Sequence, residues 1–343
     1  MSETNMLLPL IAAVTAALTL PAVAQEDPAA FYKNKQVRII VGSAAGGGYD
    51  IISRALARRW GEHIPGKPSF VVQNMAGAGS LQMTNLLYNS GPKDGTAIGS
   101  AINGMPTAPL LSPGAARFDA AKINWIGSTN REIQAVMIWH NAPVQSLQDL
   151  LTTELVVGAS SAGTATHDFP LVANAILGAK YRLIRGYEGT PQINRAMESG
   201  EVHGNGGIGW VSIKTQSAAW LKEGKIKVIG QYGLERHPEL KDVPTFMELA
   251  KTEDDKQALR LVFARQEYGR PFFVPPEVPA DRVNALRRSF DATLQDKEFL
   301  AEAAALSLDI EPMTGEQVAE LVANVSATSP TVVERVRAAL NAK

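Results

Sequence analysis

The sequence predicts an α/β protein of two domains, and three observations support this prediction. Short runs of β-branched residues alternate with amphipathic stretches, which is the pattern of parallel sheets covered by helices. The chain has 343 residues, a length that favours two domains over one. Glycine-rich segments join several expected strands to the helices that follow. The expected strands cover residues 37–41, 70–72, 97–99, 155–157, 181–184 and 226–229.

The start of the chain is typical of a secretory signal. Residues 6–20 form an apolar run that is too short for a comfortable membrane span, and Ala22 and Ala24 fit a small-residue cleavage site. We therefore expect residues 1–24 to be a signal peptide that is cleaved after Ala24, and the protein to be exported. No lysine or arginine precedes the apolar run, so an uncleaved membrane anchor is the alternative.

The charge and the cysteine count exclude several classes of function. Once residues 1–24 are removed, the chain carries 33 basic and 33 acidic side chains, because Glu3 is the one charged residue lost. A balanced surface argues against nucleic acid or an anionic membrane as a partner. The sequence has no cysteine, which excludes disulfides, thiolate metal sites, a cysteine nucleophile and the acylated cysteine of a lipoprotein.

The chain has no Pro- or Ser-rich linker, so we expect the backbone to cross between the two domains more than once. The predicted first domain combines residues 25–131 with residues 243–343, and the predicted second domain covers residues 132–242. From Pro279 onward, alanine and charged residues at helical spacing predict helices that close over a sheet.

Four glycine-rich loops are the candidate binding elements. The first, residues 43–50, joins the strand 37–41 to a helix expected over 51–60, and the second, residues 74–80, precedes a helix over 81–88. The third and fourth, residues 158–164 and 186–190, precede helices over 167–177 and 191–197. A strand that passes through glycines into a helix leaves N–H groups unpaired beside the positive end of the helix dipole. Each loop therefore predicts a socket for an anion, although strand–helix packing alone is the alternative.

Asp50 ends the first of these loops. We expect its side chain to hold the loop rather than to contact an anion, because two negative charges repel each other.

Motifs of known enzymes are not apparent. Residues 158–163 do not fit G-x-S-x-G, the glycines at 42, 46, 47 and 48 do not fit G-x-G-x-x-G, and neither G-K-[ST] nor H-E-x-x-H occurs. We therefore expect a binding protein with no catalytic residue, no metal site and no cofactor. The alternative is an exported hydrolase or transferase that uses Ser160 or Ser161 with His167.

Several segments together resemble one family. They are residues 37–50 with Arg54, the Val-Val-x-Asn and Gly-Ala-Gly elements at 71–74 and 77–79, Lys93-Asp94-Gly95, Gly-Tyr-x-Gly-Thr at 186–190 and Val243-Pro244-Thr245-Phe246. This combination resembles the Bug-type receptors, which are periplasmic solute-binding proteins of tripartite tricarboxylate transporters. The resemblance implies a two-domain periplasmic-binding-protein (Venus flytrap) fold that holds a small mono-, di- or tricarboxylate between its domains and delivers it to membrane permease subunits. A ligand-sensing partner of a membrane kinase would use the same cleft.

The loops depart from the family pattern in their details. The family's usual Pro-Pro-Gly-Gly is Ala44-Ala45-Gly46-Gly47 here, and Gly206-Gly207 stands where many relatives carry an acidic turn. The amide-bearing glycines are kept. The candidate ligand-binding residues are Ser43, Gly47, Gly48, Tyr49, Gly77, Ala78, Gly79, Ser80, Asn103, Ser160, Ser161, Gly163, Thr164, His167, Tyr187, Gly189, Thr190 and Gly207.

Overall fold

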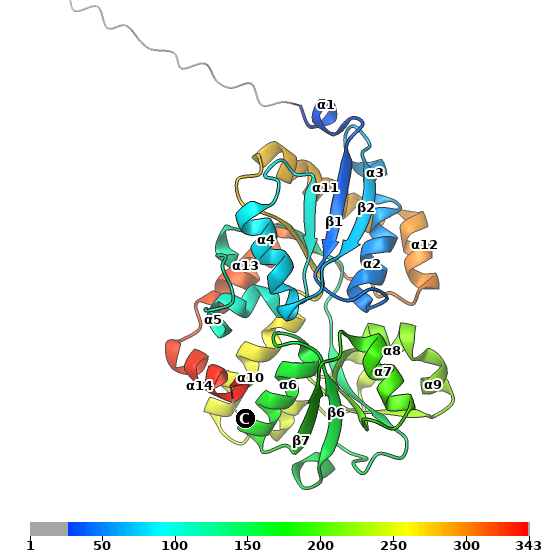
Figure 1. Cartoon of the computed structure of the whole chain (residues 1–343), viewed down its shortest axis with the longest axis vertical. Coiled ribbons are helices and arrows are strands. Elements are labelled where there is room, and N and C mark those ends of the chain that lie inside the picture. The colour runs from blue at the N-terminus through cyan, green and yellow to red at the C-terminus, as the bar shows by residue number, and fades with distance from the viewer. Residues whose placement is uncertain (1–26, 342–343) are drawn as a thin grey trace, which may run out of the picture.

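The computed structural model describes residues 27–341, which fold into two lobes that each contain one β-sheet (Figure 1). The two sheets flanked by helices confirm the α/β class expected from the sequence. The predicted signal peptide, residues 1–24, and its cleavage after Ala24 lie outside the described residues. Within residues 27–341, no helix combines the length and the hydropathy needed to cross a membrane.

The first lobe is built on a six-stranded sheet with the order β11-β4-β10-β3-β1-β2. The strands β1, β2 and β3 are parallel, while β10 runs antiparallel to β3 and β4, and β11 antiparallel to β4. The bounds of these strands are β1 (Gln36–Val41), β2 (Ser69–Asn74), β3 (Ala97–Ser100), β4 (Asn124–Ser128), β10 (Pro271–Val274) and β11 (Met313–Thr314).

Helices cover both faces of this sheet. The two neighbouring residues Phe272 and Phe273 of β10 point to opposite faces, and each is buried in its own core cluster. Phe272 packs beside Trp60, whose Nε1 donates to Ser289 Oγ at 2.9 Å. The helix expected over 51–60 is interrupted before Trp60, which opens a separate short helix and still packs into the core. The helices of this lobe are α1 (Pro28–Tyr32), α2 (Gly48–Ala57), α3 (Trp60–His63), α4 (Leu81–Ser90), α5 (Ala108–Leu111), α11 (Ala280–Gln295), α12 (Lys297–Ala305) and α13 (Gly315–Ser326).

The second lobe repeats the same strand arrangement on a five-stranded sheet with the order β7-β6-β8-β5-β9. In each lobe the first of three parallel strands lies between the second and the third, and an antiparallel strand follows beside the third. The bounds are β5 (Gln134–Trp139), β6 (Leu155–Ala159), β7 (Tyr181–Arg185), β8 (Gly204–Gly209) and β9 (Ile226–Gln231).

Strand β8 was not expected from the sequence, because four of its six residues are glycine, a residue depleted in strands. Packing explains its composition. A Cβ on Gly206 would lie 2.6 Å from Cγ of Pro170, and one on Gly207 would lie 2.4 Å from the carbonyl oxygen of Ala165. The glycines therefore allow a helix to lie directly on the strand backbone.

The helices of the second lobe are α6 (Ala165–Val172), α7 (Thr190–Glu198), α8 (Trp210–Gln216), α9 (Ala218–Lys222), α10 (Glu253–Phe263) and α14 (Pro330–Leu340). The backbone crosses between the lobes at residues 129–133, 264–270 and 327–329. The predicted limits of the domains differ from this packing in one respect. Residues 243–343 were all assigned to the first domain, but α10 and α14 bury their apolar faces in the core of the second lobe (Figure 1).

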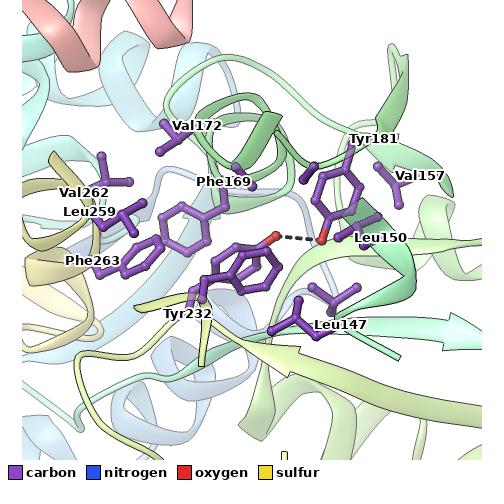
Figure 2. Close-up of a cluster of buried hydrophobic side chains, with 14 of the residues drawn as sticks. Leu147, Leu150, Val157, Phe169, Val172, Tyr181, Tyr232, Leu259, Val262 and Phe263 are labelled. Atoms are coloured by element: carbon purple, nitrogen blue, oxygen red, sulfur yellow. Dashed lines mark hydrogen bonds between the residues drawn. The ribbon is translucent and has the colours of Figure 1, made fainter. Parts of the chain in front are cut away.

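That core is organised around aromatic rings (Figure 2). The ring centroid of Phe169 on α6 lies 4.6 Å from that of Tyr232 and 5.4 Å from that of Phe263 on α10. Tyr232 also stacks on Phe246, with centroids 4.1 Å apart. The hydroxyl of Tyr232 shares a hydrogen bond of 2.9 Å with that of Tyr181, so the one polar group of each buried ring is satisfied. Helix α10 is thus held to the second lobe by Phe263.

We expect Phe169→Ala to lower the free energy of unfolding by about 3–5 kcal/mol, because it removes a fully buried ring from the centre of this cluster. Urea denaturation followed by circular dichroism measures the change. Leu221→Ala is the control, since Leu221 on α9 is exposed and its truncation is expected to change stability by no more than about 0.5 kcal/mol. Similar losses in the two variants would contradict the central place of Phe169.

Candidate functional site

A cavity of about 120 Å³ lies between the lobes and is lined by both of them. All six parallel strands end at its wall: β1, β2 and β3 from the first lobe and β6, β7 and β8 from the second. Ligands of open α/β sheets bind at this carboxyl edge because the loops after parallel strands gather there. The predicted site residues in the cavity wall are Ser43, Gly47, Gly48, Tyr49, Gly77, Gly79, Asn103, Ser160, Ser161, Thr164, Gly189, Thr190 and Gly207.

Three helices point their N-termini into this cavity. Helices α2, α6 and α7 begin after Gly47, Thr164 and Gly189, and these three N-cap residues line the wall. Among the described residues, no N-cap side chain accepts a hydrogen bond from the first N–H groups of these helices. The first turn of a helix carries a partial positive charge and leaves N–H groups unpaired. Here the amides of His167 and Gln192 bond to the carbonyls of Thr164 and Gly189, and Pro191 has no N–H, so α6 and α7 offer only their earlier amides. The cavity therefore presents donors and positive dipole ends from both lobes.

The side chain of Asp50 stabilises the first loop, residues 43–50, by hydrogen bonds. Its carboxylate accepts from the Gly46 amide at 2.8 Å, from Asn74 Nδ2 at 2.9 Å and from Arg54 Nε at 3.0 Å. Burial disfavours the charged form, but the hydrogen bonds from Arg54, Gly46 and Asn74 outweigh it and lower the pKa of Asp50 below its usual value. Asp50 thus holds the loop, as expected from the sequence.

The second loop has a left-handed backbone. Ala78, Gly79 and Ser80 have φ values of 45°, 62° and 69°. Ser80 faces away from the cavity wall, because its Oγ donates to the Gly42 carbonyl at 2.9 Å and accepts from the Ile102 amide at 3.0 Å. Ser80 therefore ties the loops after β1, β2 and β3 together rather than lining the cavity.

Two buried polar atoms of the first lobe lack a hydrogen-bond partner beside the cavity. Ser43 and Asn103 both line the cavity, and no group in residues 27–341 hydrogen-bonds to Ser43 Oγ or Asn103 Nδ2. Tyr49 positions Asn103, because its hydroxyl accepts from the Asn103 amide at 3.0 Å and donates to the Gly269 carbonyl at 3.4 Å. Burial raises the pKa of Tyr49 to about 12, so the phenol stays neutral. A buried donor without a partner costs about 1–3 kcal/mol, which a bound acceptor would recover.

Hydroxyls from the second lobe complete the wall. Ser160 Oγ lies 2.9 Å from both Thr164 Oγ1 and Thr166 Oγ1, and the amide of Ser160 donates to Thr166 at 3.1 Å. Ser161 Oγ accepts from the amide of Gly79 at 3.1 Å, which is a direct hydrogen bond between the lobes. Thr166 was not among the predicted site residues, because it is the second residue of helix α6 rather than part of the glycine-rich loop.

Five predicted residues lie outside this cavity wall. Ala78, Gly163 and His167 face a neighbouring cavity instead, and His167 Nδ1 lies 3.0 Å from Asp168 Oδ1. The hydroxyl of Tyr187 donates to Glu201 at 2.6 Å. Ser80 is the fifth, for the reason given above.

A serine–histidine pair does not form here. Ser160 and Ser161 hydrogen-bond to hydroxyls and to the Gly79 amide, while His167 pairs with Asp168, so the geometry does not favour the hydrolase alternative. Over residues 27–341 there is also no group of three or more histidine, cysteine, aspartate or glutamate side chains that could hold a metal ion.

The sequence missed two charged residues of the site. Glu132 and Arg270 line the cavity and form an ion pair, with Arg270 Nη2 2.6 Å from Glu132 Oε2, and their side chains are only 2% and 3% exposed. They lie on two different crossing segments, 138 positions apart. No local motif could have indicated this pairing, because only the tertiary fold brings the segments together.

Known proteins with similar sequences and folds are periplasmic binding proteins and an uncharacterised relative. No family model matches the chain. The UPF0065 protein in the gbd 5' region of Cupriavidus necator is 24% identical over 334 residues, which covers 95% of this chain and 94% of that protein. The structure of the periplasmic binding protein BugD has a TM-score of 0.70 at 22% identity and covers 90% of this chain and 98% of its own.

Two proteins of Rhodopseudomonas palustris have the same fold. Rpa4515, solved with adipate, has a TM-score of 0.69 at 20% identity, covering 88% of this chain and 97% of its own. MatC, solved with bound malate, has a TM-score of 0.69 at 19% identity, covering 87% and 99%. The similarities confirm the resemblance to Bug-type receptors and the two-domain periplasmic-binding-protein fold that it implies.

We expect Asp50→Asn to destabilise the protein by about 1–3 kcal/mol near pH 7, because the charged acceptor of three donors is lost. The folded pKa of Asp50 lies below its unfolded value of about 3.9, so its contribution is present above that pH and is lost as the pH falls through the folded pKa. The difference between wild type and variant should therefore shrink below about pH 4.

Unfolding free energies measured between pH 3 and pH 8 test this expectation. Asp242→Asn serves as the control, because Asp242 is exposed and should give a small difference at every pH. A difference between wild type and Asp50→Asn that stays constant with pH would contradict the role assigned to the Asp50 charge.

Proposed function

We propose that the protein is a periplasmic receptor that captures a small organic carboxylate between its lobes and delivers it to the membrane permease of a tripartite tricarboxylate-type transporter. The observation that carries this proposal is the convergence of three uncapped helix N-termini on one interlobe cavity. The free polar atoms Ser43 Oγ and Asn103 Nδ2 add donors to the same wall. A carboxylate is the complementary group, because its two oxygens are acceptors only and carry a negative charge.

The size of the cavity supports a small ligand. Pockets for drug-sized molecules measure about 300–1,000 Å³, whereas this one measures about 120 Å³. A charge-assisted hydrogen bond contributes about 1.5–3 kcal/mol, and each helix terminus adds about 0.3–1 kcal/mol. Four or five such donors supply on the order of 10 kcal/mol, from which the lost freedom and the desolvation of the ligand are subtracted.

The structural neighbours support the choice of ligand class. Rpa4515 was solved with adipate and MatC with malate, and both are dicarboxylates. BugD is described as a periplasmic binding protein, which agrees with the secretory character of residues 1–24. A receptor is favoured over an enzyme, because the cavity offers donors in place of an activated nucleophile. A sensory role would use the same cavity and the same ligand.

Direct contacts between the two lobes support a link between ligand binding and recognition by a permease. Lys214 on α8 in the second lobe pairs with Asp309 of the first lobe, with Nζ 2.8 Å from Oδ2. The Gly79–Ser161 hydrogen bond joins the lobes from another pair of loops. A ligand that contacts both lobes favours the conformation in which these contacts exist, and that closed shape is the surface a permease would recognise.

A thermal-shift screen tests the proposed ligand class. Mono-, di- and tricarboxylates of four to eight carbons and aromatic acids are added to the purified protein, with the corresponding amides as controls that lack the charge. At a concentration of 100 times its dissociation constant, a bound acid adds about 2.7 kcal/mol of stability. We expect at least one acid to raise the melting temperature while its amide does not. If no acid gives a shift, the proposed function is wrong.

A second test blocks the approach of the two lobes. A Cβ on Gly79 would lie 2.7 Å from the carbonyl oxygen of Ala162, and the residue has a φ of 62° that β-branched side chains disfavour. We expect Gly79→Val to abolish binding of the acid that the screen identifies, as measured by calorimetry. Ser161→Ala removes one interlobe hydrogen bond and should weaken binding by about tenfold or less.

Gly114→Val is the matched control, because nothing lies within 4 Å of the Cβ that it would add. Circular dichroism establishes that each variant is folded. Wild-type affinity in a folded Gly79→Val protein would show that the ligand does not bind between these loops.

A further inference from the structure

The third glycine-rich loop, residues 158–164, lies beside a buried ion pair that does not face the ligand cavity. Oδ2 of Asp168, in the first turn of α6, lies 3.0 Å from Nη1 of Arg265, and the two side chains are 6% and 2% exposed. Both residues line the neighbouring cavity instead. The Arg265 guanidinium also lies over the ring of Phe169, 4.2 Å from its centroid. A pair at this depth needs further hydrogen bonds to offset its desolvation.

Gly163 provides these hydrogen bonds. Oδ1 of Asp168 accepts from the Gly163 amide at 3.0 Å and lies 3.0 Å from Nδ1 of His167, while Nη1 of Arg265 donates to the Gly163 carbonyl at 3.4 Å. Burial disfavours the charged form of Asp168, but the hydrogen bond from His167 and the charge of Arg265 outweigh it and lower the pKa of Asp168. The ion pair therefore holds Gly163 by both its amide and its carbonyl.

The first lobe meets this peptide with two glycines. A Cβ on Gly104, in the loop after β3, would lie 2.2 Å from the Gly163 carbonyl oxygen and 2.7 Å from Nη1 of Arg265. A Cβ on Gly79, in the loop after β2, would lie 2.9 Å from the Cα of Gly163. These distances are shorter than any normal contact of a Cβ atom. The backbones of the two lobes therefore touch here because both positions lack a side chain.

A similar anchor stabilises the first loop, with one difference. Asp50, in the first turn of α2, also accepts from an amide of its loop and pairs with an arginine, Arg54. Arg54 belongs to the same helix as Asp50. Arg265 lies 97 positions from Asp168, on the crossing segment 264–270. The anchor of the third loop thus joins the loop to a segment that connects the two lobes.

We propose that Asp168 and Arg265 are positioning residues that hold the Gly163 peptide in the arrangement on which Gly79 and Gly104 of the first lobe close. The ion pair then sets the closed conformation of the receptor without touching the ligand. A loop that is already ordered loses less conformational freedom when the lobes close, which favours the closed state. The holding of the loop is independent of the proposed function, whereas its effect on closure around a ligand rests on it.

Hydrogen exchange of the ligand-free protein, followed by mass spectrometry, tests whether the ion pair holds the loop. We expect Asp168→Asn and Arg265→Gln each to accelerate exchange in the peptide that covers residues 158–164 by about tenfold, because charge-assisted hydrogen bonds are lost. The double variant should show less than the product of the two effects, since both substitutions remove the same interaction. Arg265→Lys keeps the charge and should recover part of the protection.

Two controls separate this effect from general destabilisation. A peptide from β1 in the first lobe should exchange at the wild-type rate in every variant, because the loss of the ion pair acts locally. Arg182→Gln breaks the exposed Glu154–Arg182 pair of the same lobe and should leave exchange of residues 158–164 unchanged.

A distance measurement tests closure. The sequence has no cysteine, so spin labels can be placed on Ser90→Cys and Ala175→Cys, which are exposed positions on the first and the second lobe. Double electron–electron resonance then measures the distance between the labels with malate, with adipate and with any acid that raises the melting temperature in the screen. We expect a bound acid to shift the wild-type protein to a shorter distance, and Asp168→Asn to reduce the fraction that shifts.

Gly104→Ala is the sharper variant in this measurement. Gly104 lines the neighbouring cavity rather than the ligand cavity, and its φ of −78° is accessible to alanine. We therefore expect a folded protein in which the added methyl group meets the Gly163 carbonyl and prevents the shift to the short distance. Gly114→Ala is the matched control, because nothing lies within 4 Å of the Cβ that it would add, and it should close as the wild type does.

The outcomes distinguish this inference from the proposed function. If Asp168→Asn and Arg265→Gln exchange residues 158–164 at the wild-type rate, or if Gly104→Ala reaches the short distance of the wild type, the inference is wrong while the receptor function stands. If no acid stabilises the wild-type protein or changes its distance, the proposed function fails, and exchange in the ligand-free protein still decides whether the ion pair holds the loop.

Discussion

The site depends on one geometric constraint: the parallel strands of both sheets end at the same cavity. A loop that follows a parallel strand must turn at the carboxyl edge, and the helix that returns along the sheet therefore starts there. In this protein the rule acts twice, because β1, β2 and β3 of one lobe face β6, β7 and β8 of the other. The positive ends of α2, α6 and α7 are thereby concentrated around about 120 Å³ of space.

The polar side chains around the cavity mainly position the backbone. Asp50 holds the first loop, Ser80 ties three loops of the first lobe together, and Tyr49 orients Asn103. Backbone amides, glycine Cα atoms and a few hydroxyls are left to face the ligand. Such a surface suits an anion, although the arginine in the described part of the wall, Arg270, is paired with Glu132. It also explains why Arg270 can be committed to Glu132.

The segments that cross between the lobes, residues 129–133 and 264–270, contact each other beside the cavity. The amide of Arg270 donates to Ser128 Oγ at 3.0 Å, and Ser128 Oγ donates to the Tyr268 carbonyl at 2.9 Å. Gly269 has a φ of 34°, and a Cβ there would lie 1.9 Å from the Asn130 carbonyl oxygen, so the two segments touch through their backbones. Glu132 and Arg270 project from these segments into the cavity. The cavity wall therefore includes residues of the segments that connect the two lobes.

The sequence by itself determined the fold class, the expected strands and the four loops, because periodicity and glycine runs are local signals. It also identified Asp50 as a residue that holds its loop. The tertiary structure alone decided the rest. It revealed the glycine strand β8, which forms because helix α6 packs on its backbone, and it placed α10 and α14 in the second lobe through long-range apolar contacts. It turned Ser80, Tyr187 and His167 away from the cavity. It also paired Glu132 with Arg270, since an ion pair between residues 138 positions apart has no signature in any window of sequence.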